Sequence, residues 1–214
     1  MAETGAIGIM PEGTPFNEAP VCEGAYYANA SVSKFCKPGA KALIYGASGA
    51  IGVAAAQLAK CYGADVTAVV AGRHIEMAKS LGVDRVVDYE TTEFRQLGKN
   101  FDFVLDAVGK MAVFQWRRLV NSDGFFAVTD LGRWGQDIPF LLWSAVTRTG
   151  KASVPLPQRG TAQTFVNFLG QLMATGQFRA IVDRRYPLDE IDDAYSYVQT
   201  GQKTGIVVID VKHL

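Results

Sequence analysis

The stretch Lys41-Ala-Leu-Ile-Tyr45, followed by Gly46-Ala-Ser-Gly-Ala-Ile-Gly52, decides the fold of this chain. Its first five residues form a short apolar run of the kind found in buried strands. The second part is rich in glycine and leads into residues 51–62, where apolar residues recur at the spacing of one helical face. Gly63 follows, as glycine often does after the last turn of a helix. The stretch therefore predicts a strand, a tight turn and a helix.

The same alternation of strands and helices continues on both sides of this stretch. Upstream, residues 21–36 are predicted to form a helix, because Lys37-Pro38-Gly39 then stops it. Downstream, we predict strands over residues 65–70, 85–88, 101–106 and 124–129, and helices over residues 75–81 and 112–120. The strands are mostly continuous apolar runs, so the sequence predicts an α/β fold with a doubly wound parallel sheet of the Rossmann type.

Beyond residue 131 the alternation becomes less regular. A strand is predicted over residues 151–157, helices over 165–175 and 187–200, and a closing strand over 205–211. Prolines within the first of these suit only the edge of a sheet.

Composition and charge exclude several classes of protein. The chain has 214 residues, 49% hydrophobic, and equal numbers of acidic and basic residues, so no net field favours nucleic acid or an anionic membrane. The longest apolar stretch, residues 138–146, is far shorter than the ~20 residues of a membrane-spanning helix. Three widely spaced cysteines suit a reducing compartment, and the first residues lack the pattern of a secretory signal. We expect a soluble, cytoplasmic protein without nucleic-acid or membrane partners.

The glycine-rich turn is the feature that carries chemistry. Glycines at this spacing let a backbone approach a pyrophosphate closely, and the start of the next helix offers unpaired N–H groups with partial positive charge. The spacing alone is weak in a chain with 22 glycines, so the argument rests on the strand before it and the helix after it. The predicted dinucleotide site therefore comprises Gly46, Ala47, Ser48, Gly49, Ala50, Ile51 and Gly52.

The end of the second strand indicates which dinucleotide binds. NAD sites usually place an acidic residue there, about 20 residues after the glycines, to bind the ribose 2′-hydroxyl. Asp65 lies at the wrong end of its strand for this role, and the strand is followed by Ala71-Gly72-Arg73. Since an arginine can pair with a 2′-phosphate, the sequence favours NADP(H). The alternative is that Arg73 is simply a solvated residue at a helix start.

Several motifs together resemble a known family. They are Gly46-Ala-Ser-Gly-Ala-Ile-Gly52, Gln57-Leu-Ala-Lys60, Val87-Asp-Tyr89, Phe101-Asp-Phe-Val-Leu-Asp-Ala-Val-Gly109 and Asp183-Arg-Arg-Tyr-Pro-Leu188. The chain is similar to the medium-chain dehydrogenase/reductase superfamily, in particular its NADPH-dependent branch of quinone oxidoreductase-like and zinc-binding-dehydrogenase-type proteins. The resemblance covers nearly the whole chain.

The resemblance implies a function and a set of contacts. The activity would be hydride transfer between NADPH and a small-molecule quinone, enone or other carbonyl or alcohol substrate. Pyrophosphate contacts would come from Ser48 to Ile51, and 2′-phosphate or adenine contacts from Arg73 and Tyr89. On the nicotinamide side the implied contacts are Ala107, Val108, Leu131 and Gly132. Ala71 and Gly72 stand where many NADP-binding relatives have hydroxyl residues, which weakens the NADP preference.

The resemblance also implies a division of the chain. Residues 1–36 would be a lead segment and linker helix from a catalytic domain, residues 37–160 the Rossmann NADP(H)-binding domain, and residues 161–214 a return to that catalytic domain. Family members carry an N-terminal catalytic domain before the part that this chain resembles. The chain is thus expected to be either an oxidoreductase of this type or a cofactor-binding module without turnover.

Other sites are excluded or left open. No tyrosine has a lysine four residues on, and neither histidine suits a nucleophilic Ser48, so catalytic residues stay unassigned. With two histidines and no Cys-x-x-Cys spacing, no metal site is expected. Tyr26 and Tyr27 could be core residues or could stack near a nicotinamide. Phe140-Leu-Leu-Trp143 could be core or a homodimer interface.

Overall fold

The computed structural model describes residues 8–111, 115, 117–129, 152–154 and 160–211. Leu131, Gly132, the segment Phe140-Leu-Leu-Trp143, and residues 112–114 and 116 of the predicted helix over residues 112–120 lie outside the described residues.

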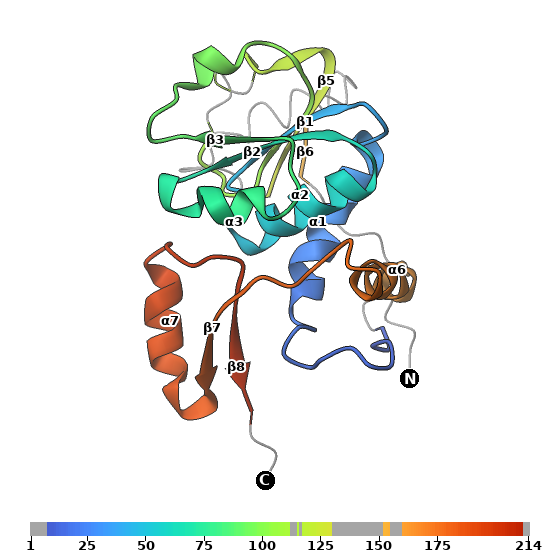
Figure 1. Cartoon of the computed structure of the whole chain (residues 1–214), viewed down its shortest axis with the longest axis vertical. Helices are drawn as coiled ribbons and strands as arrows, with labels where there is room; N and C mark the ends of the chain where they lie inside the picture. Colours follow the sequence, from blue (N-terminus) through green and yellow to red (C-terminus); the bar gives the residue numbers. More distant parts are fainter. Residues whose placement is uncertain (1–7, 112–114, 116, 130–151, 155–159, 212–214) are drawn as a thin grey trace.

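A six-stranded parallel sheet forms the larger part of the molecule (Figure 1). Its strands are connected in the order β3-β2-β1-β4-β5-β6, which is the order of a doubly wound dinucleotide-binding fold. The predicted fold class is therefore confirmed. The strands are β1 (Lys41–Tyr45), β2 (Asp65–Val70), β3 (Arg85–Asp88), β4 (Phe101–Asp106), β5 (Val120–Val128) and β6 (Ala152–Ser153).

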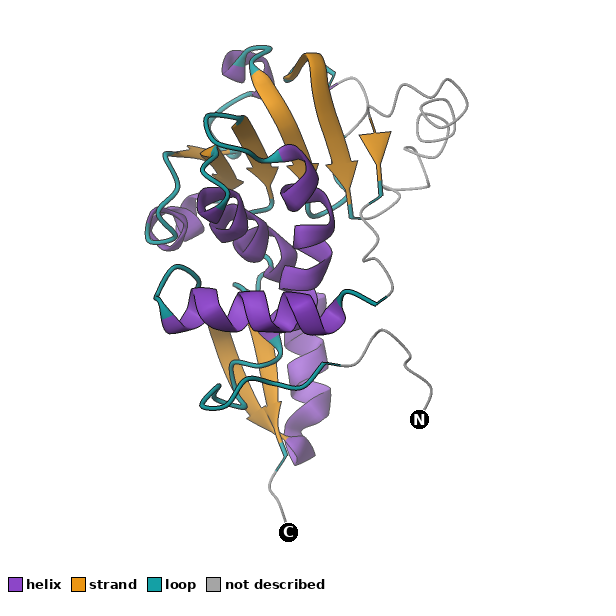
Figure 2. Ribbon diagram, turned by 90° about the vertical axis from the view of Figure 1, so that its right-hand side faces the viewer, coloured by secondary structure: helices purple, strands orange, loops and turns teal. Residues whose placement is uncertain are grey.

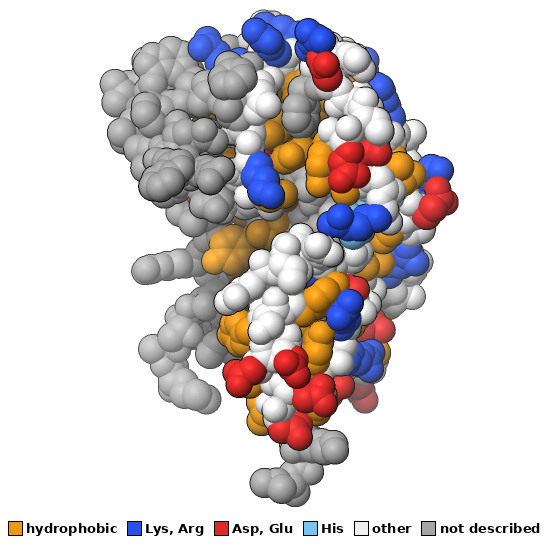
Figure 3. Space-filling model, turned by 90° about the vertical axis from the view of Figure 1, so that its left-hand side faces the viewer, with side chains coloured by type: hydrophobic (Ala, Val, Ile, Leu, Met, Phe, Trp, Pro, Cys, Tyr) orange, Lys and Arg blue, Asp and Glu red, His pale blue; other side chains and the backbone are white. Residues whose placement is uncertain are grey.

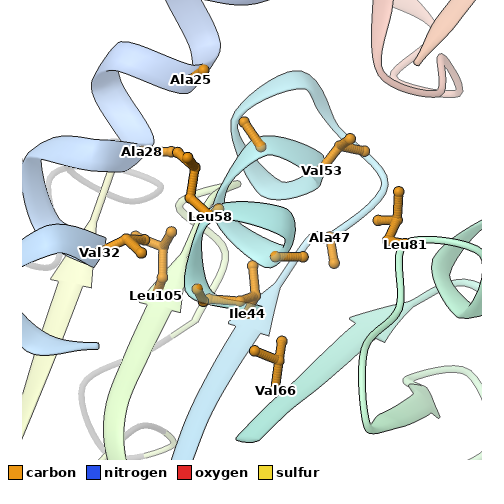
Figure 4. Packing of buried hydrophobic residues seen from close by; sticks show 14 of the residues in the cluster. Ala25, Ala28, Val32, Ile44, Ala47, Val53, Leu58, Val66, Leu81 and Leu105 are labelled. Carbon is orange, nitrogen blue, oxygen red and sulfur yellow. The ribbon is translucent and has the colours of Figure 1, made fainter. Parts of the chain in front are cut away.

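Three α-helices lie together on one face of this sheet (Figure 1). They are α1 (Val21–Phe35), α2 (Ala50–Cys61) and α3 (Ile75–Lys79), and two short 3₁₀ helices, η1 (Gly72–His74) and η2 (Phe94–Leu97), lie in the connections. The packing is close because α2 presents several small residues to its neighbours: Ala54, Ala55 and Ala56 are fully buried. Figure 4 shows Leu58 of α2 between side chains of α1 and the sheet.

Both faces of the sheet are buried, which explains the continuous apolar runs. In β1, Ile44 packs into the cluster under α1 and α2, whereas Leu43 points to the opposite face and joins a second cluster. β4 repeats this arrangement, with Leu105 on the first face and Val104 on the second. All four side chains are completely buried, so a polar residue at any of these positions would lose its hydration.

The C-terminal elements form a smaller part beside the large sheet (Figure 2). Here β7 and β8 form a separate two-stranded parallel sheet. We refer to residues 182–210 as the C-terminal lobe. Its elements, with the helix that precedes it, are α6 (Ala162–Ala174), β7 (Val182–Pro187), η4 (Leu188–Glu190), α7 (Ile191–Gln199) and β8 (Ile206–Asp210).

The predicted bounds of β1, β2, β3 and β4 are confirmed, but other predictions need correction. β7 was not predicted, because Asp183, Arg184 and Arg185 interrupt any apolar run, and Pro187 ends this strand instead of beginning a helix. Val120 begins β5, so it does not belong to the helix predicted to end there. The strand predicted over residues 151–157 has two described strand residues, which form β6.

Candidate dinucleotide site

The glycine-rich turn lies where β1 ends and α2 begins, and two of its glycines are required by the turn itself. Gly46 has a φ of +77°, and a Cβ atom there would lie 2.1 Å from Val108 Cγ2. A Cβ atom on Gly52 would lie 2.0 Å from the carbonyl oxygen of Gly46. Both positions therefore need glycine for packing, whatever ligand the turn binds.

Gly49 differs from these two glycines. Its backbone is extended, with φ −81° and ψ 170°, so a larger residue would not be strained. A Cβ atom there would meet only the Gly46 carbonyl oxygen, at an ordinary contact distance of 3.7 Å. The described protein does not require glycine at this position, whereas a ligand lying close to the backbone would.

The first turn of α2 offers hydrogen-bond donors that the protein does not use. Gly49 is the N-cap and provides no side-chain cap, and the first turn contains no acidic residue. Among the described residues, no hydrogen bond between backbone groups uses the N–H of Ser48 or Ile51. These N–H groups and the helix dipole together make a site for an anion.

The C-terminal lobe contacts this turn, which the sequence analysis did not anticipate. The backbone N–H of Gly205 donates to the Ser48 carbonyl oxygen at 2.7 Å, and Gly205 forms a parallel bridge with Gly49. Gly205 has a φ of +63°, and a Cβ atom there would lie 2.0 Å from the Ile181 carbonyl oxygen. The only sign of this contact in the sequence is that a glycine directly precedes the apolar strand β8.

Arg73 lies just beyond the end of β2 and is exposed. Its Nε donates to His74 Nε2 at 3.0 Å, so this nitrogen accepts and the His74 ring is neutral. His74 Nδ1 then donates to Thr204 Oγ1 at 3.2 Å, which links the ring to the C-terminal lobe. Burial lowers the pKa of His74, and the positive charge of Arg73 lowers it further. Figure 3 shows basic and acidic side chains close to one another on one face of the molecule.

Two carboxylates from the end of β3 also reach this position. Glu90 Oε2 accepts a hydrogen bond from the Gly72 backbone N–H at 3.0 Å, and Asp88 Oδ1 accepts one from the Glu90 N–H at 2.9 Å. A Cβ atom on Gly72 would lie 2.9 Å from Asp88 Oδ2, so the absence of a side chain makes room for these acids. Sequence reasoning searched β2 for an acid and missed them. Asp88 ends β3 and Glu90 follows it closely, and the end of β3 lies beside the end of β2, so their position in the sequence was the available signal.

Asp65 and Tyr89 lie as expected relative to the strands. Asp65 begins β2 and lies opposite Lys41 of β1 in the strand register. It is therefore at the other end of the strand from Arg73. Tyr89 is 42% exposed, and its ring centroid lies 6.0 Å from that of Tyr45. Tyr89 and Glu90 line a hollow of about 520 Å³, together with Arg95 and Arg118.

A buried aspartate shapes the opposite end of the site. Asp106, at the end of β4, accepts hydrogen bonds from the N–H groups of Val108, Gly109 and Met111 at 3.0, 2.9 and 2.7 Å. Burial raises the pKa of Asp106, although these hydrogen bonds favour its charged form. The carboxylate thereby fixes the loop that holds Ala107 and Val108, two of the predicted contacts.

A second hollow, of about 490 Å³, lies next to the start of α2. Its lining includes Tyr27, Ala50, Ile51 and Thr129. Tyr26 points elsewhere: its hydroxyl lies 2.7 Å from Thr161 Oγ1 and its ring packs on Phe165. Of the two tyrosines, Tyr26 is thus a packing residue and Tyr27 lines the hollow.

The described residues do not fit a zinc ion or a membrane span. They contain no group of three or more His, Cys, Asp or Glu side chains placed to hold a metal. None of their helices is long and apolar enough to cross a bilayer. Cys22, Cys36 and Cys61 are free thiols.

Residues 81–209 match the family described as zinc-binding dehydrogenase. The matched residues make up more than half of the chain. The chain belongs to this family. The resemblance to medium-chain dehydrogenases and reductases is thereby confirmed.

Individual relatives agree with this assignment. The chain is 31% identical to the "Chloroplast envelope quinone oxidoreductase homolog" of Arabidopsis thaliana, over 80% of this chain and 52% of that protein. It is 30% identical to the mouse "NAD(P)H oxidoreductase RTN4IP1, mitochondrial", over 83% of this chain and 49% of that protein. The solved structure of the quinone oxidoreductase from Coxiella burnetii shares the fold, with a TM-score of 0.77 and 24% identity over 88% of this chain and 58% of that one. The chain spans about half the length of these relatives.

Proposed function

We propose that this chain is the cofactor-binding part of an NADP(H)-dependent oxidoreductase that transfers hydride between the nicotinamide and a quinone, an enone or another carbonyl or alcohol. The observation that carries the proposal is the first turn of α2. The unused N–H groups of Ser48 and Ile51 and the open space at Gly49 suit a pyrophosphate. The names of the relatives support nicotinamide-dependent reduction.

The residues would divide the work along the bound dinucleotide. The start of α2 holds the pyrophosphate, while Arg73 and Tyr89 hold the adenosine end with its 2′-phosphate. At the other end, the Asp106-braced loop with Ala107 and Val108 would position the nicotinamide, beside the hollow that Tyr27 and Thr129 line. A reduced nicotinamide supplies the hydride once it is bound there, and the protein supplies its orientation.

Cofactor binding without turnover is the second candidate for the 214 residues alone. Hydride transfer requires a substrate held against the nicotinamide, and such positioning supplies up to ~7–11 kcal/mol of barrier reduction. Relatives about twice as long have further chain with which to build the opposite wall of that cleft. A homodimer and a cytoplasmic location stay predictions. The names of two relatives mention a chloroplast envelope and a mitochondrion.

One binding experiment tests the proposal. NADPH and NADH are titrated by fluorescence against the wild type, Gly49→Val and Arg73→Ala. We expect the wild type to prefer NADPH and Arg73→Ala to lose roughly 1.5–3 kcal/mol of NADPH binding, since a charge-assisted contact is removed. Gly49→Val should bind neither cofactor because its side chain fills the pyrophosphate space.

Circular dichroism and thermal melts show whether the variants fold, which the extended backbone of Gly49 leads us to expect. Near-normal affinity in folded Gly49→Val would place the cofactor elsewhere. A wild type without NADPH preference, or an Arg73→Ala variant that keeps it, would contradict the NADP(H) assignment. Loss of NADPH absorbance with a panel of quinones and enones then distinguishes turnover from binding alone.

A further inference from the structure

We propose that Glu90 sets how strongly this site discriminates between NADPH and NADH, by competing with the 2′-phosphate for the backbone N–H of Gly72. The inference rests on the proposed cofactor function. It adds a specificity-determining residue that acts against Arg73.

The first step is the position of Gly72. This residue follows β2 and lies twenty residues after Gly52, the last glycine of the turn. In dinucleotide-binding folds an acid about 20 residues after the glycines binds the 2′-hydroxyl of the adenosine ribose. The backbone at Gly72 is therefore expected to lie beside the 2′ substituent of the cofactor.

The second step is the occupant of that position. Glu90 Oε2 accepts the Gly72 N–H at 3.0 Å, although Glu90 comes from the loop after β3. Asp88 supports this placement by accepting the Glu90 N–H. The loop after β3 thus delivers a carboxylate where an NAD-specific site has an acid on β2 itself.

The third step concerns charge. A carboxylate at this position can accept a hydrogen bond from a ribose 2′-hydroxyl, whereas it repels a phosphate. Arg73 has the opposite preference. Among the described residues, the ion pairs are Lys60–Asp84, Lys79–Glu76 and Arg95–Glu93, so neither Glu90 nor Arg73 is neutralised by an ion-pair partner. The two side chains therefore act as separate and opposing determinants.

The fourth step is that Glu90 can release the backbone N–H of Gly72. Glu90 is exposed and lines the 520 Å³ hollow, so its side chain has room to turn away from Gly72. NADPH binding would then require Glu90 to leave and would gain the Gly72 N–H as a phosphate donor. NADH binding would keep Glu90 in place.

The test is a comparison of dissociation constants for NADPH and NADH in the wild type, Glu90→Gln and Arg73→Ala. Glutamine keeps an acceptor for the Gly72 N–H and removes the charge, so the loop should keep its fold. We expect Glu90→Gln to raise the preference for NADPH over NADH roughly tenfold, and Arg73→Ala to lower it. The preference for 2′,5′-ADP over 5′-AMP as competitor should shift in the same direction, because these probes differ by the same 2′-phosphate. Neither probe has a nicotinamide, so the shift reports the adenosine end alone.

Glu93→Gln is the matched control. Glu93 lines the same hollow and loses the same charge, but it pairs with Arg95 and does not contact Gly72. An equal effect in Glu93→Gln would show that any negative charge in this hollow changes the cofactor preference. That result would overturn the specific role of Glu90. If Glu90→Gln keeps the wild-type preference while Arg73→Ala loses it, the inference fails and the proposed function stands. If the wild type binds neither cofactor, both fail.

Discussion

The large sheet and the C-terminal lobe are both parallel sheets, yet their strands differ in burial. The strands β1 and β4 are buried on both faces, and their central residues have no exposed surface. In β7, by contrast, no residue is fully buried, and Arg184 and Arg185 are exposed. A strand that is covered on both faces must be apolar throughout, whereas one with an open face is free to carry charges. The first kind can be recognised from sequence, and the second is easily missed.

Each region is braced by an aspartate, but in different surroundings. Asp106 is fully buried and accepts three backbone N–H groups from the loop after β4. Asp183 in β7 is half-buried and accepts the Tyr197 hydroxyl at 2.6 Å and the Thr204 N–H at 2.9 Å. Both carboxylates accept hydrogen bonds, so comparing them measures how much burial adds to the stability that such bonds contribute.

The largest effect is expected from Asp106→Ala. It leaves three N–H groups without an acceptor inside the protein, so we expect a loss of about 4 kcal/mol in the free energy of unfolding. Asp183→Ala should cost about 1 kcal/mol, because water can reach the freed groups. Urea denaturation of the two variants measures both values. Equal losses would mean that the two regions do not differ in the way their burial indicates.

A second pair, Gly52→Ala and Gly205→Ala, sharpens the same comparison. In each variant the new Cβ atom would lie 2.0 Å from a backbone carbonyl oxygen. Gly52 is buried in the first turn of α2, against the backbone of the turn that follows β1, so we expect a loss of about 3 kcal/mol, as for severe overpacking of a core.

Gly205 lies in the C-terminal lobe directly before β8, where neighbouring backbone can shift, so its variant should chiefly expose that lobe to limited proteolysis. The pair is compared by thermal melting and by the position of the first proteolytic cut. A main melting transition lowered as much by Gly205→Ala as by Gly52→Ala would show that the two regions unfold as one unit.

The smallest effect concerns His74, which connects the two regions through Arg73 and Thr204. Its side chain is 8% exposed and its pKa is lowered, so the folded state binds its proton less readily than the unfolded state does. This contribution to stability is present above about pH 6.5, the usual histidine value, and is lost as the pH falls toward the lower pKa of the folded state.

The variant His74→Asn keeps an acceptor for Arg73 and a donor for Thr204 but does not titrate. Its melting temperature should therefore fall less than that of the wild type between about pH 7 and about pH 5. Parallel pH profiles of the two proteins would rule out His74 as the titrating group.

Much of the candidate site could be predicted because it is local. The glycines from Gly46 to Gly52 lie between a strand and a helix that adjoin them in the chain, and Arg73 comes three residues after the end of β2. Asp106 was predicted only as the last residue of a strand. Its role as the brace of the loop after β4 depends on a side chain turning back onto the next five residues, which no spacing shows.

The sequence by itself determined the large sheet, since hydrophobic periodicity and glycine placement are local properties that act through burial and backbone sterics. It also determined that an arginine follows β2. Only the tertiary structure decided what stands around that arginine. Glu90 reaches Gly72 because the ends of β2 and β3 lie side by side, and Gly205 reaches Ser48 because the C-terminal lobe folds back onto the turn. Contacts between distant parts of the chain depend on how strands and lobes pack, and that information is not carried by the order of residues within any one segment.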